Sequence, residues 1–180
     1  EEGIKYIKMA ADKGYPNALY NMGVFKSEGN KDKTEAAKYY KMAADLGHIK
    51  AINNYALFLL YGDGVPFNVE EAIKYYKKGI EKGDPYSMFC YAEMLDEGLG
   101  IVDNKEESLK YYKMSADLGY VESMNWYAAM LLNGNGTAPN KEEAKKYYKM
   151  AIDKGSDIAM YNYGLMLSKE ENSESKQEAI

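Results

Sequence analysis

Two kinds of amphipathic helix alternate along the chain, and the spacing of apolar residues predicts both. In the first kind, small residues recur five positions apart. Large apolar residues follow one, four and eight positions after the first small one, as Met88, Tyr91 and Leu95 follow Ser87. This spacing places them on one face of a helix and does not fit the alternation of a strand. The second kind carries the string Lys-Tyr-Tyr-Lys. We call the two kinds A and B, in chain order.

Polar residues and glycines indicate where the B helices begin and end. A short polar residue followed three positions later by glutamate forms a capping box at each start. Each end has a glycine, which suits the left-handed conformation that closes helices. The final capping pair predicts that a further B helix begins at Ser175. The capping pairs are Asp32 and Glu35, Asn68 and Glu71, Asn104 and Glu107, Asn140 and Glu143, and Ser175 and Glu178; the glycines are Gly14, Gly47, Gly83, Gly119 and Gly155.

The Lys-Tyr-Tyr-Lys string recurs at a constant spacing. It begins at Lys38, Lys74, Lys110 and Lys146, so each step is 36 residues. Because one helical pair of this size cannot bury both of its faces, such units stack on one another. We therefore expect an all-α chain that forms a single solenoid over residues 1–180. The expected units are 1–14 (helix B only), 15–47, 48–83, 84–119, 120–155 and 156–180 (partial).

The residue order within each unit resembles the Sel1-like repeat, a relative of the tetratricopeptide repeat. The shared order is small-x3-[Met/Tyr]-[Gly/Ala]-x2-Leu-x2-Gly-x-Gly and then Ala-x2-Tyr-Tyr-x-Met-Ala with a closing glycine, as in 127–136 and 144–155. The first full unit departs from it at Lys26 and at Gly29-Asn30, so we expect it to be the least regular. The resemblance implies a right-handed α/α superhelix of about four and a half repeats, with A helices on the concave wall. It also implies an adaptor or scaffold that binds other proteins.

The charge of the chain narrows the class of partner. All 23 basic residues are lysines and the net charge is -5. Without arginine the chain lacks the forked donor that reads guanine or phosphate, and an acidic chain repels a phosphate backbone. We therefore expect no nucleic acid. No apolar run approaches the roughly 20 residues that cross a bilayer, so we expect no direct membrane insertion by this segment.

The A helices carry large apolar residues outside their core stripe, where a solvated wall would carry mostly Lys, Glu and Ser. Exposed aromatic and aliphatic side chains of this kind often mark a partner site. We expect Tyr61, Tyr86 and Phe89 to be the main anchors, and the neighbouring carboxylates to favour a partner with some basic residues. Packing against the next A helix or a loop is the alternative. The predicted partner-binding residues are Tyr20, Leu57, Leu60, Tyr61, Tyr86, Phe89, Glu93, Asp96, Leu132, Tyr161 and Leu165.

Motifs that suggest catalysis or a metal site have simpler explanations. Gly-x-Gly sequences such as 62–64 follow helices rather than strands and lack the other residues of a phosphate loop. His48 is the sole histidine, so neither a histidine triad nor a histidine-rich metal site can form. Cys90 is the sole cysteine, and we expect a buried residue rather than a nucleophile. One cysteine forms no intrachain disulfide, which favours a reducing compartment such as the cytoplasm.

The sequence thus predicts a non-enzymatic scaffold without cofactor or metal. Its partner would be a peptide or another protein, bound in the concave groove that the A helices line. The alternative is an architectural spacer or regulatory arm of a larger multidomain protein whose activity lies outside this chain.

Overall fold

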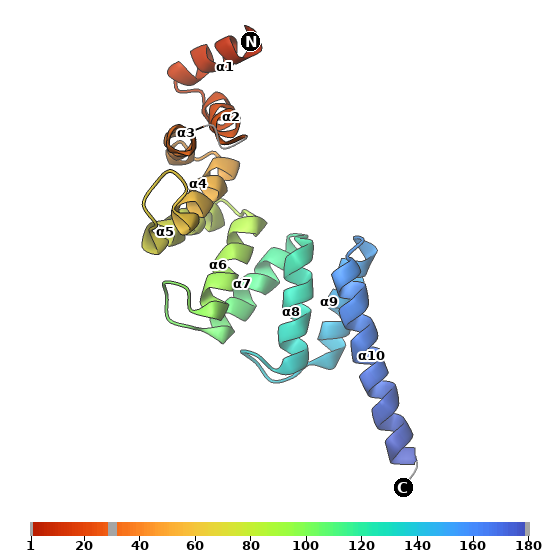
Figure 1. The fold of residues 1–180 in the computed structure, drawn as a ribbon. Helices are drawn as coiled ribbons and strands as arrows, with labels where there is room; N and C mark the ends of the chain where they lie inside the picture. Colours follow the sequence, from red (N-terminus) through yellow and green to blue (C-terminus); the bar gives the residue numbers. More distant parts are fainter. Residues whose placement is uncertain (1, 29–31, 179–180) are drawn as a thin grey trace. The chain divides into compact units, whose positions relative to one another are not determined.

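The computed structural model describes residues 2–28 and 32–178, with side chains to residue 170, and throughout this part the regular structure is helical (Figure 1). The all-α prediction is therefore confirmed. The A helices are α2 (Pro16–Ser27), α4 (Ile49–Tyr61), α6 (Pro85–Glu97), α8 (Val121–Asn133) and α10 (Asp157–Glu178). The B helices are α1 (Glu2–Asp12), α3 (Lys33–Asp45), α5 (Val69–Glu81), α7 (Lys105–Asp117) and α9 (Lys141–Asp153).

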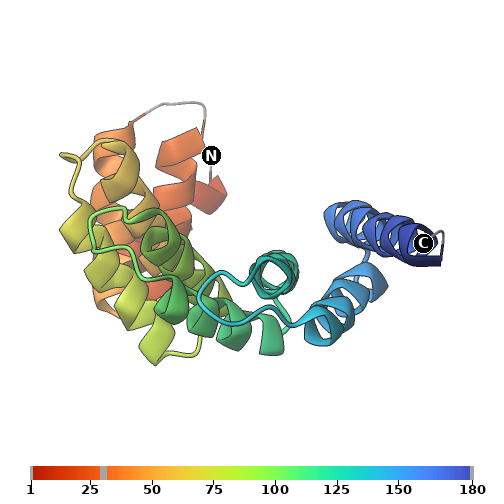
Figure 2. The same cartoon turned by 90° about the horizontal axis from the view of Figure 1, so that it is seen from below.

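The helices form two compact units, Glu1–Tyr91 and Ala92–Ile180, with the boundary inside α6. We call them unit 1 and unit 2. In unit 1, each helix from α1 to α5 packs against the next one along the chain. The same holds in unit 2 from α7 to α10, and α10 also contacts α8. Figure 2 views α8 nearly along its axis, with α9 and α10 beside it. Each unit is therefore a row of helices stacked in chain order.

The predicted helix ends are confirmed at four B helices. The side-chain oxygens of Asp32, Asn68, Asn104 and Asn140 each accept a hydrogen bond, 2.9–3.1 Å long, from the backbone N–H of the glutamate three residues later. These bonds satisfy N–H groups that have no partner within the helix. The closing glycines adopt the left-handed conformation, with φ from 75° to 95°, at Gly14, Gly47, Gly83, Gly119 and Gly155.

The prediction that a B helix begins at Ser175 is wrong, because α10 continues without a break to Glu178. Helices α4 and α8 end at left-handed glycines, Gly62 and Gly134. The position in α10 equivalent to Gly134 holds Glu170, which is a good helix former and supplies no stop. The missing glycine explains why the helix runs on through Ser175 with the backbone unbroken.

The first full repeat also ends its A helix differently. Helix α2 stops at Glu28, whose φ and ψ of -61° and 128° are extended rather than left-handed. The Gly29-Asn30 substitution that we expected to make this repeat irregular lies outside the described residues. The end of α2 at Glu28 therefore differs from the ends of α4 and α8, which are closed by left-handed glycines.

The core of both units is built from the predicted stripe of small and large residues. The small positions Ala51, Ala56, Ala92, Ser123 and Ala128 are all 0% exposed. Met160 of α10 is 47% exposed, but the large residues on the same face of α6 and α8 are buried, as the helical spacing predicted. They include Met88, Tyr91, Leu95, Met124, Tyr127 and Leu131.

Small residues set the distance between neighbouring helices. A Cβ atom added to Gly79 of α5 would lie 1.9 Å from Oγ of Ser87 in α6. A Cβ atom added to Gly23 of α2 would lie 2.6 Å from the ring of Tyr40 in α3. Interiors are packed to crystal density, so an added methyl group at either position has no room unless the helices separate.

The second glycine of two Gly-x-Gly turns packs against the preceding B helix. A Cβ atom on Gly64 would lie 2.3 Å from the carbonyl carbon of Lys33, and one on Gly136 would lie 2.3 Å from the carbonyl oxygen of Lys105. Both glycines also have positive φ, 68° and 75°. The turn therefore needs glycine for two reasons: the backbone has a positive φ, and it lies against the backbone of the preceding repeat. This agrees with a turn role and not with a phosphate loop.

Successive B helices are joined by a tyrosine that reaches an aspartate one repeat earlier. In unit 2 the Tyr147 hydroxyl donates to Oδ1 of Asp117 at 2.5 Å, and Lys113 donates to Oδ2 of the same carboxylate at 2.7 Å. In unit 1, Tyr75 and Lys41 bind Asp45 in the same way, at 2.8 and 2.6 Å. The first tyrosine of Lys-Tyr-Tyr-Lys therefore links repeats at two of the four strings, through Tyr75 and Tyr147.

Hydrogen bonds keep the pKa of Asp117 below its ordinary value of 3.8. Burial alone would raise that pKa, but the bonds from Lys113 and Tyr147 and the lysine charges outweigh burial. A lowered folded-state pKa contributes stability that is present above pH 3.8 and is lost as the pH falls through the folded-state pKa. The bond between repeats is therefore acid-sensitive.

We predict that Tyr147→Phe lowers the free energy of unfolding by about 1 kcal/mol at pH 7, because Asp117 loses one hydrogen bond. The variant should also lose less stability than the parent chain when the pH falls below 3.8. Urea unfolding at pH 7 and at acid pH measures both effects. The control is Tyr161→Phe, which removes a hydroxyl from an exposed ring. Equal effects of the two variants would contradict the proposed link.

We predict that Gly136→Ala destabilises the chain more than Gly155→Ala. Both glycines have positive φ, so both variants pay a conformational cost of about 1–2 kcal/mol. Only Gly136 also meets backbone atoms, since nothing lies within 4 Å of a Cβ atom on Gly155. Thermal and urea unfolding should show at least about twice the loss for Gly136→Ala. Similar losses would mean that the contact with Lys105 does not hold the turn.

Candidate protein-interaction surface

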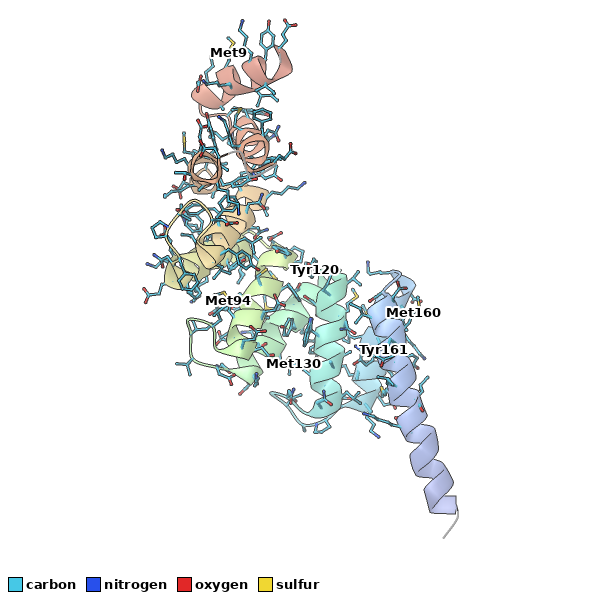
Figure 3. All side chains as sticks on the ribbon, in the orientation of Figure 1. Met9, Met94, Tyr120, Met130, Met160 and Tyr161 are labelled. Carbon is cyan, nitrogen blue, oxygen red and sulfur yellow. The ribbon has the colours of Figure 1, made fainter. Side chains whose placement is uncertain are left out.

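The A helices present a second face beside the buried stripe, and the predicted binding residues lie on it. None of them is buried. On α4, Tyr61 is 75% exposed whereas Tyr55 of the core stripe is 5% exposed. On α10, Tyr161 and Leu165 are 68% and 45% exposed (Tyr161 is labelled in Figure 3). Unit 1 carries Tyr20, Leu57, Leu60, Tyr61, Tyr86 and Phe89, and unit 2 carries Glu93, Asp96, Leu132, Tyr161 and Leu165.

Tyr20 packs against its own neighbours. Its ring stacks on the His48 ring, with centroids 4.6 Å apart, and lies 6.0 Å from the ring of Tyr40. His48 in turn caps α4, because its Nδ1 accepts the backbone N–H of Ala51 at 3.2 Å. Burial lowers the pKa of His48, which keeps this nitrogen an acceptor. The packing alternative thus fits Tyr20, while the rest of its ring borders a hollow between α2 and α4.

The two acidic residues of the predicted site, Glu93 and Asp96, should attract a basic partner only weakly. Asp96 binds the Lys105 ammonium at 3.0 Å, and that ammonium also donates to the Asp96 backbone carbonyl. Burial, and then the charge of Glu97, raises the pKa of Glu93 to about 7. Near neutral pH, Asp96 is therefore already paired and Glu93 is only partly charged.

Two asparagines in the same helix column as Tyr20 and Phe89 have a structural role. Asn53 donates to Asp84 at 2.9 Å and accepts from the Ser87 hydroxyl at 2.7 Å. In unit 2, Asn162 of α10 donates to Asn125 of α8 at 3.0 Å. These bonds join neighbouring A helices, so this column holds the stack together where it carries asparagine.

The structure adds residues that the sequence pattern did not single out. In unit 2, a hollow of about 430 Å³ lies between the first turns of α8 and α10, bordered by Val121, Trp126 and Ile158. Trp126 is 44% exposed and stacks on Tyr112, with ring centroids 6.2 Å apart. Ile158 is 64% exposed. The only signal for Trp126 in the sequence is that it is the sole tryptophan of the chain.

A second hollow of unit 2, of about 290 Å³, lies where α8 ends. Leu132 and Met166 form its apolar lining, and Lys141, Lys169 and Glu170 surround them. Glu170 pairs with Lys145 at 3.1 Å and lies 3.8 Å from Lys141. Of the residues predicted from the sequence, only Leu132 borders this hollow.

A metal site needs several ligand side chains close together, and a reactive cysteine needs an accessible thiol. Among the described residues, no group of three or more His, Cys, Asp or Glu side chains could hold a metal ion. Cys90 is buried, as predicted, and burial followed by the neighbouring Cys90 thiol raises the pKa of Tyr76. No helix within the described ranges is long and apolar enough to cross a membrane.

Six segments of the chain, 1–15, 16–48, 49–84, 85–120, 121–156 and 157–174, each match the Sel1 repeat. The chain belongs to the Sel1 repeat family. Proteins of this family are generally protein-interaction scaffolds and are typically non-catalytic. The resemblance drawn from residue order is thereby confirmed.

Solved structures of Sel1 repeat proteins superpose well on the chain. A protective antigen present in uropathogenic Escherichia coli strains is 26% identical with a TM-score of 0.87, over 93% of this chain and 36% of its own. A Sel1 repeat protein from Oxalobacter formigenes is 27% identical with a TM-score of 0.83, over 88% of this chain and 66% of its own. The chain thus spans only part of both proteins. A comparison with curated protein sequences finds no match.

We predict that Glu93→Gln stabilises the chain at pH 8 but not at pH 4.5. The pKa of Glu93 is raised to about 7, so the parent chain loses stability as the pH rises from 4.5 through 7, where a half-buried carboxylate must ionise. After discounting for solvent screening, the gain at pH 8 is about 1–2 kcal/mol. Urea unfolding at both pH values measures it. The exposed residue Glu106 supplies the control Glu106→Gln, and a pH-independent effect of Glu93→Gln would contradict the assignment.

Proposed function

We propose that this Sel1 repeat chain is a scaffold that binds a peptide or partner protein along the surface of its A helices, the inner wall expected of the solenoid. The observation that carries the proposal is a difference in burial between the two faces of the A helices. On α4 and α8 one face is buried in the stack, and on α4 and α10 large apolar side chains stay in contact with solvent, most of all Tyr61 and Tyr161. Packing within the units does not account for these two residues.

Burial of the exposed side chains by a partner would be strongly favourable. Each large apolar side chain contributes about 1.5–3 kcal/mol when it leaves water. Tyr61, Tyr161 and Leu165 are 75%, 68% and 45% exposed, so about half or more of that contribution is still available in the unbound chain. Aromatic side chains also dominate the few residues that carry most of the energy of an interface. The affinity should therefore depend on a few positions.

Charge should affect orientation and rate more than affinity. Glu97 and Glu122 are exposed on the A helices, so a partner with some basic residues still fits the surface. Asp96 contributes less, because Lys105 already occupies its carboxylate. Basic residues in the partner are therefore expected opposite Glu97 and Glu122.

We predict that Tyr161→Ser and Tyr61→Ser each weaken binding of a partner about 10- to 100-fold, without a change in helicity or melting temperature. The partner is first identified by capture on the chain, and its Kd is then measured by calorimetry with each purified variant. Phe67→Ser is the matched control, because Phe67 is 64% exposed but lies in the loop between α4 and α5.

The control also tests the alternative of a passive spacer. A spacer that holds two domains apart would show no contact-specific loss of affinity, so all three variants would bind like the parent chain. That result, or a larger loss for Phe67→Ser than for either tyrosine variant, would contradict the proposal.

A further inference from the structure

The proposed function does not specify the chemistry of the partner. The apolar residues and charges on α8 and α10 of unit 2 indicate what kind of partner fits. We propose that the surface formed by α8 and α10 binds an amphipathic helix of three to four turns that carries a basic residue at one end and an acidic residue at the other. This inference rests on the proposed function, since it names the kind of partner that the same surface accepts. We call this surface the α8–α10 face, defined by Glu122, Leu132, Ile158, Tyr161, Leu165 and Lys169.

An apolar ridge runs along α10. Ile158, Tyr161 and Leu165 are spaced three and four residues apart, which places them on one side of the helix, and all three are at least 45% exposed. The bond between Asn162 and Asn125 holds α10 against α8 beside this ridge. Ridges of this spacing pack into the grooves of another helix, and helix-in-groove docking uses apolar residues at the same intervals.

The two hollows described above lie at opposite ends of the α8–α10 face. One borders the first turns of both helices, and the other borders Leu132 and Asn133 at the end of α8. Helix α8 has 13 residues, which at 1.5 Å per residue gives a length of about 20 Å. A partner helix of three to four turns therefore reaches from one hollow to the other with an apolar side chain in each. An extended peptide would cover the same length without matching the ridge.

The charges at the two ends differ in sign. At the first hollow, Glu122 and Asp157 outnumber Lys154. At the second hollow, Lys141 and Lys169 outnumber Glu170, which is moreover held by Lys145. A partner with a basic residue at the first end and an acidic residue at the second therefore meets complementary charge at both. This polarity also fixes the direction in which the partner lies.

Trp126 makes the binding measurable, because the sole tryptophan of the chain borders the first hollow and is 44% exposed. The probes are two designed amphipathic helical peptides without aromatic residues. Both carry the same apolar face and a lysine near one end, and they differ only at the other end, which is glutamate in the first and lysine in the second. Titration of the 180-residue chain is followed by Trp126 fluorescence and by calorimetry.

We expect the lysine–glutamate peptide to bind about 5- to 10-fold more tightly than the lysine–lysine peptide at low salt, with a shift in Trp126 emission. Lys169→Glu should reverse that preference. Lys110→Glu, at an exposed position on α7, should leave it unchanged. Tyr161→Ser should weaken both peptides about tenfold, because they share the apolar ridge. A peptide with a central proline should bind far more weakly, since proline breaks the helix.

Several results would overturn the inference. These are no binding, equal affinity for the two peptides, a preference that survives Lys169→Glu, or full binding of the proline peptide. If the captured natural partner still loses affinity with Tyr161→Ser while the peptides fail, the inference falls and the proposed function stands. If Tyr161→Ser leaves the natural partner unaffected, the proposed function fails on its own test.

Discussion

The close approach of neighbouring helices at small residues is the constraint on which the rest of the structure depends. Alanine and serine at the stripe positions of α4, α6 and α8 are completely buried, and Gly79 leaves room for Ser87 that a single methyl group would fill. Because a helical pair cannot bury both faces alone, this contact is repeated along each unit. Stability is therefore shared among repeats, and any residue that pushes two helices apart affects its neighbours.

The same constraint decides which residues remain for binding. The buried stripe occupies one side of α4, α6 and α8, and the tyrosine–aspartate links at Asp45 and Asp117 lie on the B helices. The side that is left carries large apolar residues, of which Tyr61 and Tyr161 are the most exposed. In unit 2 these lie beside two hollows with charges of opposite sign, so the surface has both an apolar part and a direction.

Features that depend on local chemistry could be predicted from the sequence. The capping boxes, the closing glycines and the buried stripe follow from residue type and spacing within one or two turns. Features that depend on partners elsewhere in the chain could not. Asp96 was predicted to contact a partner, but its carboxylate is paired with Lys105. The bonds of Asn53 to Asp84 and Ser87 join residues more than 30 positions apart, which spacing within one helix does not indicate. The continuation of α10 past Glu170 follows from a missing stop signal, which the capping pattern at Ser175 concealed.

Hydroxyl-radical footprinting of the chain alone and bound to its partner tests the central claim most directly, because it reports the solvent exposure of individual side chains. The account predicts protection of Tyr61, Tyr161 or Leu165 on the A helices, with no change at exposed B-helix residues such as Met42 and Met114. Protection confined to those methionines, with the A-helix tyrosines still oxidised, would place the partner on the opposite side and contradict the account.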